Sequence, residues 1–336
     1  MNFNSRIIKL SLCSALLAAA FSPAAMAADH TAARVTFDGQ IRNNSLAISP
    51  DENTAVVSYS ERPEVIVYNL QTGAVRGVLS GYVTPRNIVF AADGKSFYVS
   101  DSSRGELVKV DSASLQTLSR LAAGPGAFGT TLSKDGAALY VNNQASSTVT
   151  RFDTGTEQAR AVVTGFAQPR QGVRLSPDGS KLYVTNFLGD KVTIVDTKTD
   201  KIDGEISGFS KIRAISVTAD GKTMFAANSG TNNIAVVDIA KREISSVVPV
   251  GRDPYGAALT PDGRYVYSGN LADNTVSVIE VASLKVVATI SGFKQPRQAI
   301  VFTRDGKLVY VLNEDLSISK VDRSSQQIIG QITAKP

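Results

Sequence analysis

Short apolar runs alternate with polar turns along most of the chain. Residues 175–201 (LSPDGSKLYVTNFLGDKVTIVDTKTDK) contain a tight turn, an apolar run, a polar loop, a second apolar run and another polar turn. The apolar runs are short and rich in Val, Ile, Leu and Tyr, which is typical of β-strands. Helical periodicity does not interrupt them. The pattern therefore predicts an all-β chain of short antiparallel strands.

This stretch occurs in seven copies. Aligned on the aspartate of the turn, successive copies are 42, 42, 43, 42, 42 and 43 residues apart, at Asp51, Asp93, Asp135, Asp178, Asp220, Asp262 and Asp305. A period in the low forties with strand-like segments is typical of propeller blades. We therefore predict a seven-bladed β-propeller with four antiparallel strands per blade. A strand near residues 34–37 and another at 327–333 lead us to expect that N- and C-terminal strands close the ring in the last blade.

Two positions recur in most copies, and we interpret both as structural. The turn Ser176-Pro177-Asp178-Gly179 has the residue order that suits a type I turn, although Glu52 replaces the glycine in the first copy. Eight residues after the turn aspartate, most copies carry an asparagine such as Asn186, which we expect to bond within its loop. A residue that the blades share is explained by the blade. A binding site is therefore sought among positions that vary.

The segment Leu182-Tyr183-Val184-Thr185-Asn186 resembles the YVTN-type propeller repeats of secreted bacterial and archaeal proteins. Variants occur at residues 97–101, 139–143 and 309–313, and the resemblance covers roughly residues 46–325. It implies a seven-bladed propeller. Relatives with such repeats include surface-layer proteins, the heavy chain of quinone-dependent amine dehydrogenases and lactonase-like enzymes, so the resemblance implies a fold more strongly than a function.

The first 27 residues have the features of a secretory signal peptide. Arg6 and Lys9 precede an apolar stretch at residues 10–21, and Ala25-Met26-Ala27 offers a cleavage site. We expect residues 1–27 to be removed and residues 28–336 to form one propeller domain that is periplasmic or secreted, with no transmembrane segment left. An uncleaved membrane helix is the alternative, but the apolar stretch is shorter than the ~20 residues that a span needs.

Composition narrows the chemistry. Cleavage after Ala27 would remove Cys13, the only cysteine, and the only histidine, His30, would lie near the new N-terminus. The chain then lacks a Ser-His-Asp triad, a Cys-His pair and a His-rich metal site, so we predict no metal and no cofactor and favour a non-enzymatic function. The formal net charge is +5, which loss of Arg6 and Lys9 lowers to +3. The charges are scattered, which disfavours nucleic-acid binding.

The connections between blades carry the main candidate site. Five hold an arginine and two hold an aromatic residue at about the same place, and we expect all seven side chains to surround one mouth of the channel: Arg42, Arg86, Phe128, Arg170, Arg213, Tyr255 and Arg297. Guanidinium groups match carboxylate, phosphate or sulfate, which predicts an anionic ligand or a partner protein at this loop-rich face. The alternative is that the arginines bond neighbouring loop carbonyls or acids and only lock the ring, through residues such as Glu61, Asp101, Asp190 and Asp273.

Three functional hypotheses follow. The favoured one is a non-enzymatic exported module or scaffold that binds a partner protein or anionic ligand at the arginine-lined mouth. The second is an enzyme, either a lactonase-like hydrolase or the propeller subunit of a periplasmic redox complex with a cofactor-bearing partner. The third is single-stranded nucleic-acid binding on aromatic stacking surfaces, which the modest charge and the export signal disfavour.

Overall fold

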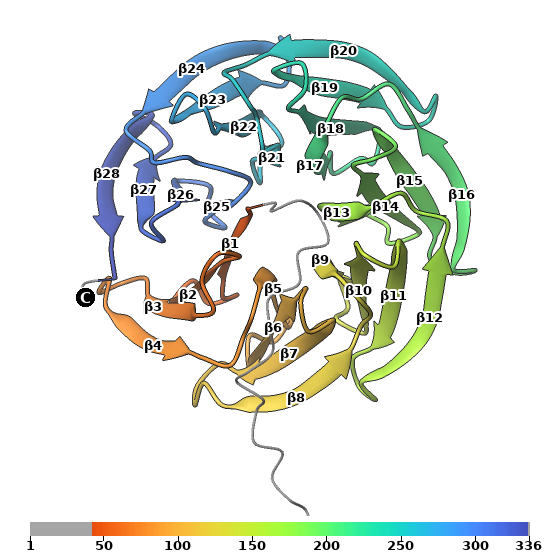
Figure 1. Ribbon diagram of the computed structural model, residues 1–336. Coiled ribbons are helices and arrows are strands. Elements are labelled where there is room, and N and C mark those ends of the chain that lie inside the picture. Colours follow the sequence, from red (N-terminus) through yellow and green to blue (C-terminus); the bar gives the residue numbers. More distant parts are fainter. Residues whose placement is uncertain (1–41, 335–336) are drawn as a thin grey trace, which may run out of the picture.

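The computed structural model describes residues 42–334. Seven four-stranded antiparallel sheets stand around a central channel (Figure 1), and no helix occurs within the described range. The all-β fold with seven blades and four strands per blade, predicted above, is confirmed. The predicted signal peptide and the strand expected near residues 34–37 lie outside the described residues.

The four strands of each blade follow one another in the chain and run in order from the channel to the rim (Figure 1). Blades one to three contain β1 (Asn44–Ile48), β2 (Thr54–Tyr59), β3 (Val65–Asn69), β4 (Val75–Leu79), β5 (Pro85–Phe90), β6 (Ser96–Asp101), β7 (Glu106–Asp111), β8 (Thr117–Ala122), β9 (Ala127–Leu132), β10 (Ala138–Asn143), β11 (Thr148–Asp153) and β12 (Gln158–Thr164). Blades four and five contain β13 (Pro169–Leu175), β14 (Lys181–Asn186), β15 (Lys191–Asp196), β16 (Lys201–Ile206), β17 (Ile212–Val217), β18 (Thr223–Asn228), β19 (Asn233–Asp238) and β20 (Glu243–Pro249). Blades six and seven contain β21 (Ala258–Leu259), β22 (Tyr265–Asn270), β23 (Thr275–Glu280), β24 (Lys285–Ser291), β25 (Ile300–Phe302), β26 (Leu308–Leu312), β27 (Ile318–Asp322) and β28 (Gln327–Ile332).

The middle strands of a blade are buried on both faces because neighbouring blades cover them. Every residue of β2 is buried, and only Lys181 of β14 is not. Strands covered on both faces read as continuous apolar runs rather than alternating ones, which explains the unbroken Leu-Tyr-Val signature. The outer strands instead expose most of their residues, and Pro249 lies at the end of one of them, β20. A proline is tolerated there because an outer edge strand does not need every main-chain N–H for pairing.

Seven hydrophobic clusters fill the seven interfaces between blades. Each cluster combines side chains of two neighbouring blades. Between blades four and five, for example, Tyr183 and Val192 pack in one cluster with Ile212 and Met224. The blades are thus joined mainly by burial of apolar surface, which contributes about 25 cal/mol for each Å² removed from water.

The ring closes between blades one and seven by the same kind of packing, supplemented by hydrogen bonds. Blade seven is the continuous stretch β25 to β28, with the C-terminal β28 as its outer strand. The hydroxyl of Tyr68 donates to the carbonyl of Leu316 at 3.1 Å, and that of Tyr59 donates to the Glu314 carboxylate at 2.9 Å. These bonds join residues about 250 positions apart in the chain, so they form only when the ring is complete.

The turn aspartates organise their own turns, as predicted. The Ser176 hydroxyl donates to Asp178 Oδ1 at 2.5 Å, and the Ser180 main-chain N–H donates to the same oxygen at 3.0 Å. Gly179 follows with a φ of 73°, in the left-handed region that favours glycine. Glu52 takes this place in blade one with a φ of 59°, and its carboxylate accepts the main-chain N–H of Arg304 in blade seven at 2.5 Å. The exceptional residue therefore contacts the blade across the closure.

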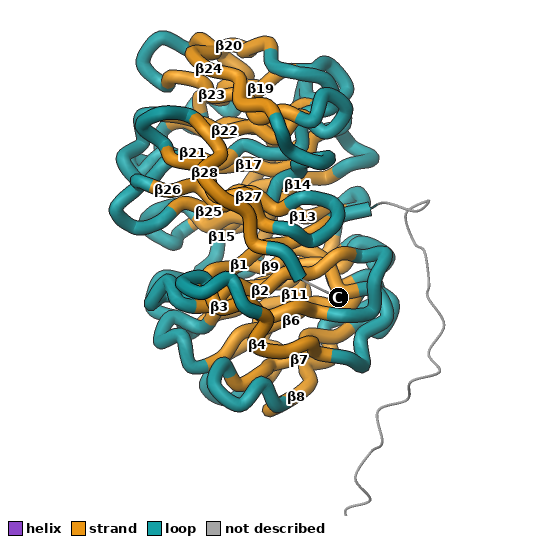
Figure 2. Tube along the Cα trace, turned by 90° about the vertical axis from the view of Figure 1, so that its left-hand side faces the viewer, coloured by secondary structure: helices purple, strands orange, loops and turns teal. Residues whose placement is uncertain are grey.

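The asparagines eight residues after the turn aspartates tie blades four, five and seven to the connections that precede them. Asn186 Oδ1 accepts the main-chain N–H of Ala167 at 2.8 Å, and its Nδ2 donates to Thr193 Oγ1 at 2.9 Å. Asn313 makes the equivalent bond to the N–H of Lys294 at 2.9 Å. The predicted structural role is confirmed, since Nδ2 bonds the asparagine's own loop and the strand after it, while Oδ1 in these copies also holds the blade connection. Figure 2 shows these loops and the opposite turns on two faces, with strands between them.

The turn aspartates predict an acid-sensitive fold. Hydrogen bonds from Ser176 and Ser180 lower the pKa of Asp178 from its ordinary value of 3.8 to about 2, and the Lys181 ammonium helps to lower that of Asp196 to about 2. Carboxylates with lowered pKa contribute stability that is present above pH ~4 and is lost as the pH falls from about 4 to about 2. We expect the urea midpoint to fall across this window. In Asp178→Asn it should be lower at pH 7 and change less with pH, and parallel profiles for the two proteins would contradict this.

Candidate functional site

The seven residues predicted to surround the channel mouth lie at or just before the first strand of each blade. Arg86, Phe128, Arg170 and Arg213 lie within first strands, whereas Arg42, Tyr255 and Arg297 lie just before them. Their placement at the blade connections puts all seven on the loop-rich face, at one end of the channel. We call this set the mouth residues. All except Arg42 are buried, and the Arg42 side chain is 56 % exposed.

The main chain of the mouth residues is held by the preceding blade. The Ser100 hydroxyl in blade two donates to the carbonyl of Phe128 in blade three at 2.5 Å. Asn142 Nδ2 in blade three donates to the carbonyl of Arg170 in blade four. In blade six, a Cβ added to Gly269 would lie 2.4 Å from the carbonyl oxygen of Arg297. A side chain there would push the arginine's connection away, which is why glycine suits the position.

Arg86 shows how a mouth side chain joins three blades. Its Nη1 donates to Asn43 Oδ1 of blade one at 3.0 Å, and its Nε donates to Ser102 Oγ of its own blade at 3.0 Å. The guanidinium carbon lies 4.7 Å from the ring centroid of Phe128 in blade three. Asn43 also donates, through Nδ2, to the Arg86 carbonyl at 3.0 Å. This arginine is 2 % exposed and connects its neighbours as the ring-locking alternative requires.

Aromatic rings separate the remaining buried arginines. The guanidinium carbon of Arg170 lies 3.3 Å from the ring centroid of Phe187, and that of Arg213 lies between Phe187 at 5.1 Å and Tyr255 at 4.3 Å. The guanidinium carbon of Arg297 also lies close to Tyr255, 5.1 Å from its ring centroid. Cation–π attraction at such distances is worth about 0.5–2 kcal/mol per contact. The row runs Arg170, Phe187, Arg213, Tyr255, Arg297 and spans blades four to seven.

Phe187 was not among the predicted site residues. It follows Asn186 in the loop between β14 and β15, so it approaches the mouth from a different loop than the other seven. The signal in the sequence was its aromatic side chain at a position where the other copies have Ser60, Ser102, Gln144, Ser229, Leu271 and Glu314. Phe187 therefore meets the criterion that a binding site is sought among positions that vary between blades.

The acids expected to offset the arginines serve the loop main chain instead. Asp101 accepts the N–H groups of Val83 and Thr84 at 2.6 and 3.1 Å, and Asp190 accepts that of Lys211 at 2.6 Å. Asp273 likewise accepts the main-chain N–H of Arg252 at 2.6 Å. Asp101, Asp190 and Asp273, three of the four acids named in the ring-locking alternative, thus accept main-chain N–H groups of the blade connections. They stabilise the blade connections on which the arginines are carried.

Two mouth arginines consequently keep buried N–H groups without an acceptor in the described part of the chain, namely Arg213 Nη1 and Arg297 Nε. Arg213 Nε donates to Ser229 Oγ at 3.0 Å, and Arg297 Nη1 donates to the carbonyl of Arg42 at 3.0 Å. Neither forms an ion pair with a described acid. An unsatisfied buried donor costs about 1–3 kcal/mol, so the mouth has an excess of positive charge and of hydrogen-bond donors.

Below the mouth, the channel contains a cavity of about 270 Å³. First strands of six blades line it, and Arg174 of β13 is the one charged side chain among the lining residues. Arg174 was not among the predicted site residues, because the repeat places it in the apolar run that leads into the turn. Its neighbours in the cavity wall are amides, hydroxyls and aliphatic side chains.

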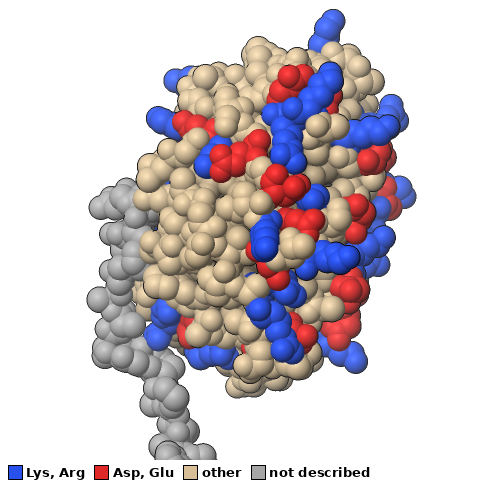
Figure 3. All heavy atoms as spheres, turned by 90° about the vertical axis from the view of Figure 1, so that its right-hand side faces the viewer, with Lys and Arg blue, Asp and Glu red and all other residues tan. Residues whose placement is uncertain are grey.

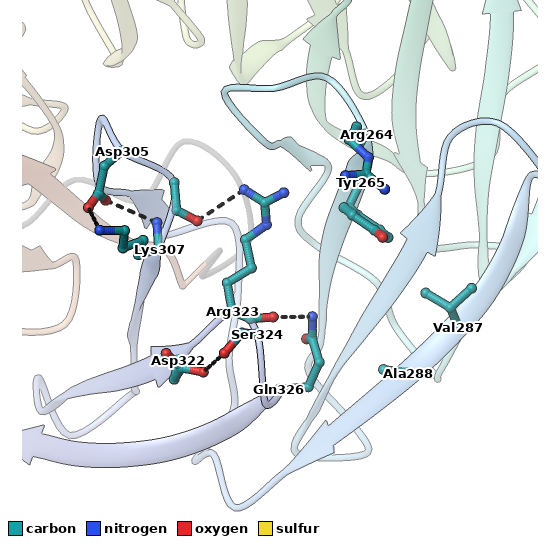
Figure 4. Close-up of a pocket in the computed structure, with 11 residues that line it drawn as sticks. Arg264, Tyr265, Val287, Ala288, Asp305, Lys307, Asp322, Arg323, Ser324 and Gln326 are labelled. Atoms are coloured by element: carbon teal, nitrogen blue, oxygen red, sulfur yellow. Dashed lines mark hydrogen bonds and ion pairs between the residues drawn. The ribbon is translucent and has the colours of Figure 1, made fainter.

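A larger hollow of about 690 Å³ lies outside the channel, between blades six and seven (Figure 4). Most of its charged side chains already have polar partners, and Arg264 lies 5.6 Å from the ring centroid of Tyr265. Arg323 donates to Asp262 and to the carbonyl of Gly306, while Lys307 pairs with Asp305 at 3.5 Å. Asp322 accepts the Ser324 hydroxyl at 2.6 Å. This hollow is therefore a weaker candidate than the channel, whose donors lack acceptors.

Residues 42–334 contain no group of three or more His, Cys, Asp and Glu side chains placed to hold a metal ion. A helix long and apolar enough to cross a membrane is likewise not found among them.

Comparison with known proteins places the chain in a family. Residues 45–207 and 195–291 match the family described as "Lactonase, 7-bladed beta-propeller". The chain belongs to this family. No curated protein matched it significantly. Among solved structures, a chain of hydrazine synthase from Kuenenia stuttgartiensis is similar, with a TM-score of 0.75 and 21% sequence identity, covering 83% of this chain and 95% of that chain. At this identity the likeness shows the fold alone.

The side of this lactonase-family propeller drawn in Figure 3 carries both signs of charge, with Lys and Arg interspersed among Asp and Glu. Arg151 pairs with Asp200 at 2.6 Å, and Lys191 pairs with Glu205 at 2.5 Å. Extended polyanions such as nucleic acids bind surfaces where basic residues predominate. The mixed surface on this side does not have that character.

Removing a buried mouth arginine should destabilise the ring. Arg86→Ala leaves Asn43 Oδ1 without its donor and a void beside Phe128, so we expect the free energy of unfolding to fall by about 2–4 kcal/mol. Urea denaturation measures the change. Arg304→Ala is the matched control, because that side chain is exposed, and we expect a change within about 0.5 kcal/mol. Equal effects of the two substitutions would contradict the locking role of Arg86.

Proposed function

We propose that the protein is a non-enzymatic exported propeller that binds an oxyanion group, carried by a small ligand or a partner protein, at its arginine-lined mouth. The observation that carries the proposal is the pair of arginines on either side of Tyr255. Arg213 and Arg297 each have a buried N–H group without an acceptor, and neither has a described acid as partner. A carboxylate or phosphate oxygen would supply both the acceptors and the missing negative charge.

The geometry also explains how a locked ring can still bind. Main-chain contacts and aromatic stacking hold the arginines in place, so little conformational entropy is lost when a ligand arrives. The unpaired N–H groups are covered by neighbouring atoms, and a ligand therefore reaches them only if a side chain rotates. Such rotamer changes are common when binding sites are occupied.

Export and repeat type complete the proposal. We infer that residues 1–27 are a signal peptide, that residues 28–336 form the working domain, and that the protein acts in the periplasm or outside the cell. The repeat segments are of the YVTN type. N-terminal sequencing of the exported protein tests the processing, and we expect it to start at Ala28.

Membership of the lactonase family favours a second candidate, hydrolysis of a lactone. Such a reaction needs a group that activates water. One acid near the mouth arginines is Glu314, whose carboxylate lies 3.9 Å from Arg42 and accepts the Tyr59 hydroxyl. These two contacts already occupy the carboxylate, which would have to hold a water molecule to act as the base. We therefore rank hydrolysis second.

A thermal-shift titration tests anion binding. At constant ionic strength, phosphate or citrate should raise the melting temperature, since a ligand at 100 times its Kd stabilises the native state by about 2.7 kcal/mol. Arg297→Gln should weaken the affinity by roughly tenfold or more, whereas Arg304→Gln should leave it unchanged.

Two outcomes would overturn the proposal. One is that neither anion, nor any protein captured from a periplasmic extract, depends on Arg213 and Arg297 for binding. The other is steady turnover of γ- or δ-lactones by the purified protein, measured by acid release at constant pH. That result would put hydrolysis first.

A further inference from the structure

The cavity in the middle of the channel is separate from the mouth and has its own chemistry. It measures about 270 Å³ and is lined by Asn44 of β1, Asn87 of β5, Arg174 of β13 and Gln298 just before β25, among aliphatic side chains. This is room for roughly nine water molecules at ~30 Å³ each. The cavity could therefore hold a compact organic molecule.

Arg174 brings an unneutralised charge to this cavity. Its Nη1 donates to the carbonyl of Val173 at 2.8 Å, and it forms no ion pair with any acid in residues 42–334. The side chain is open to the channel but surrounded by protein, and this desolvation lowers the pKa of its guanidinium. An arginine remains protonated under such conditions, so the cavity contains a cation without a counter-charge.

Three amide atoms in the same wall lack hydrogen-bond partners within the described structure. Asn44 is completely buried, and neither its Nδ2 nor its Oδ1 has a partner. Gln298 donates through Nε2 to the Asn44 carbonyl at 2.7 Å, but its Oε1 accepts nothing. Asn87, by contrast, accepts from the N–H and the hydroxyl of Thr130 at 3.2 and 2.5 Å. The unpaired atoms are therefore specific to one part of the wall.

The route into the cavity leads from the face opposite the mouth. Arg174 also lines two grooves, of about 650 and 690 Å³, whose other residues belong to first strands and to the Pro-Asp-Gly turns. These turns lie on the opposite face from the blade connections. A ligand could thus reach Arg174 without passing Arg213 and Arg297, and the two sites are independent.

We propose that the middle of the channel is a second binding site, for a small hydroxylated carboxylate. The carboxylate binds the Arg174 guanidinium, which presents a planar fork of donors. The hydroxyl groups of the ligand donate to Asn44 Oδ1 and Gln298 Oε1 and accept from Asn44 Nδ2, after rotation of these covered side chains turns the atoms toward the cavity. A neutral polyol would leave Arg174 unneutralised, and a carboxylic acid without hydroxyls would leave the amide oxygens without donors.

Isothermal titration calorimetry with D-glycerate and propionate tests the site, because both probes carry one carboxylate but only glycerate carries hydroxyls. We expect glycerate to bind at least tenfold more tightly than propionate. Arg174→Gln should weaken glycerate binding roughly 10- to 100-fold, the loss expected for a charge-assisted hydrogen-bonded pair. Arg304→Gln is the surface control and should not change glycerate affinity. Arg297→Gln reports any glycerate that binds at the mouth instead of the cavity.

Asn44→Ala separates ligand recognition from a structural role. Because both polar atoms of Asn44 lack partners, their removal should leave the melting temperature unchanged or raise it, while abolishing the preference for glycerate over propionate. A merely structural asparagine would show the opposite behaviour, with a lowered melting temperature and an unchanged preference.

Several results would overturn the proposal. In calorimetry, these are equal binding heats for glycerate and propionate, or no heat from either acid at millimolar concentration. Unchanged glycerate affinity in Arg174→Gln would also contradict it. So would a structure determined at high glycerate concentration that shows only water in the cavity. Loss of glycerate binding in Arg297→Gln but not in Arg174→Gln would move the site to the mouth. Failure of phosphate or citrate to bind the mouth would leave the channel site untouched.

Discussion

The burial of apolar surface between neighbouring blades is the interaction on which everything else depends. A single blade has two hydrophobic faces, and only a complete ring covers both faces of all seven. The interface between blades one and seven is made like the other six, with hydrogen bonds from Tyr59 and Tyr68 across it. In the described residues no strand is exchanged between blades. Packing therefore sets the number of blades, the width of the channel and the positions of the residues that surround it.

This constraint gives the mouth residues their unusual chemistry. The connections of blades two, four, five and seven are fixed by the asparagine or aspartate of their own blade, so their arginines have little freedom. Phe187 and Tyr255 lie between the guanidinium groups and partly offset their burial without neutralising them. Acidic partners would have neutralised the positive charge of the guanidinium groups. Aromatic partners leave that charge in place, so the same arginine side chains can join blades and attract an anion.

The sequence was sufficient for the fold because each blade repeats the same local rules. The Asp178 turn, the Asn186 position and the Leu-Tyr-Val strand each have a physical cause visible in one copy, and seven copies confirm one another. Arg86 could be placed at the mouth by the same logic. Phe187 stands out in the sequence by its position in the repeat, but its contact with Arg213 of the next blade does not. Arg174 lies in an apolar run of the repeat, and its place beside the cavity depends on how several blades pack. The orphan amides of Asn44 and Gln298 depend on three-dimensional packing that no spacing in the sequence encodes.

The contiguity of each blade has a consequence for how such a protein can change over evolution. Since every described blade is one uninterrupted segment of about 42 residues, duplication or loss of one segment adds or removes a whole sheet without leaving an unpaired strand. What changes is the angle between neighbouring blades. A ring of six or eight blades would also have a channel of a different width. Duplication or loss of a blade would therefore affect the residues that line the channel more than the rest of the protein. Duplication or deletion of a single blade would therefore change which residues face Arg174 across the channel.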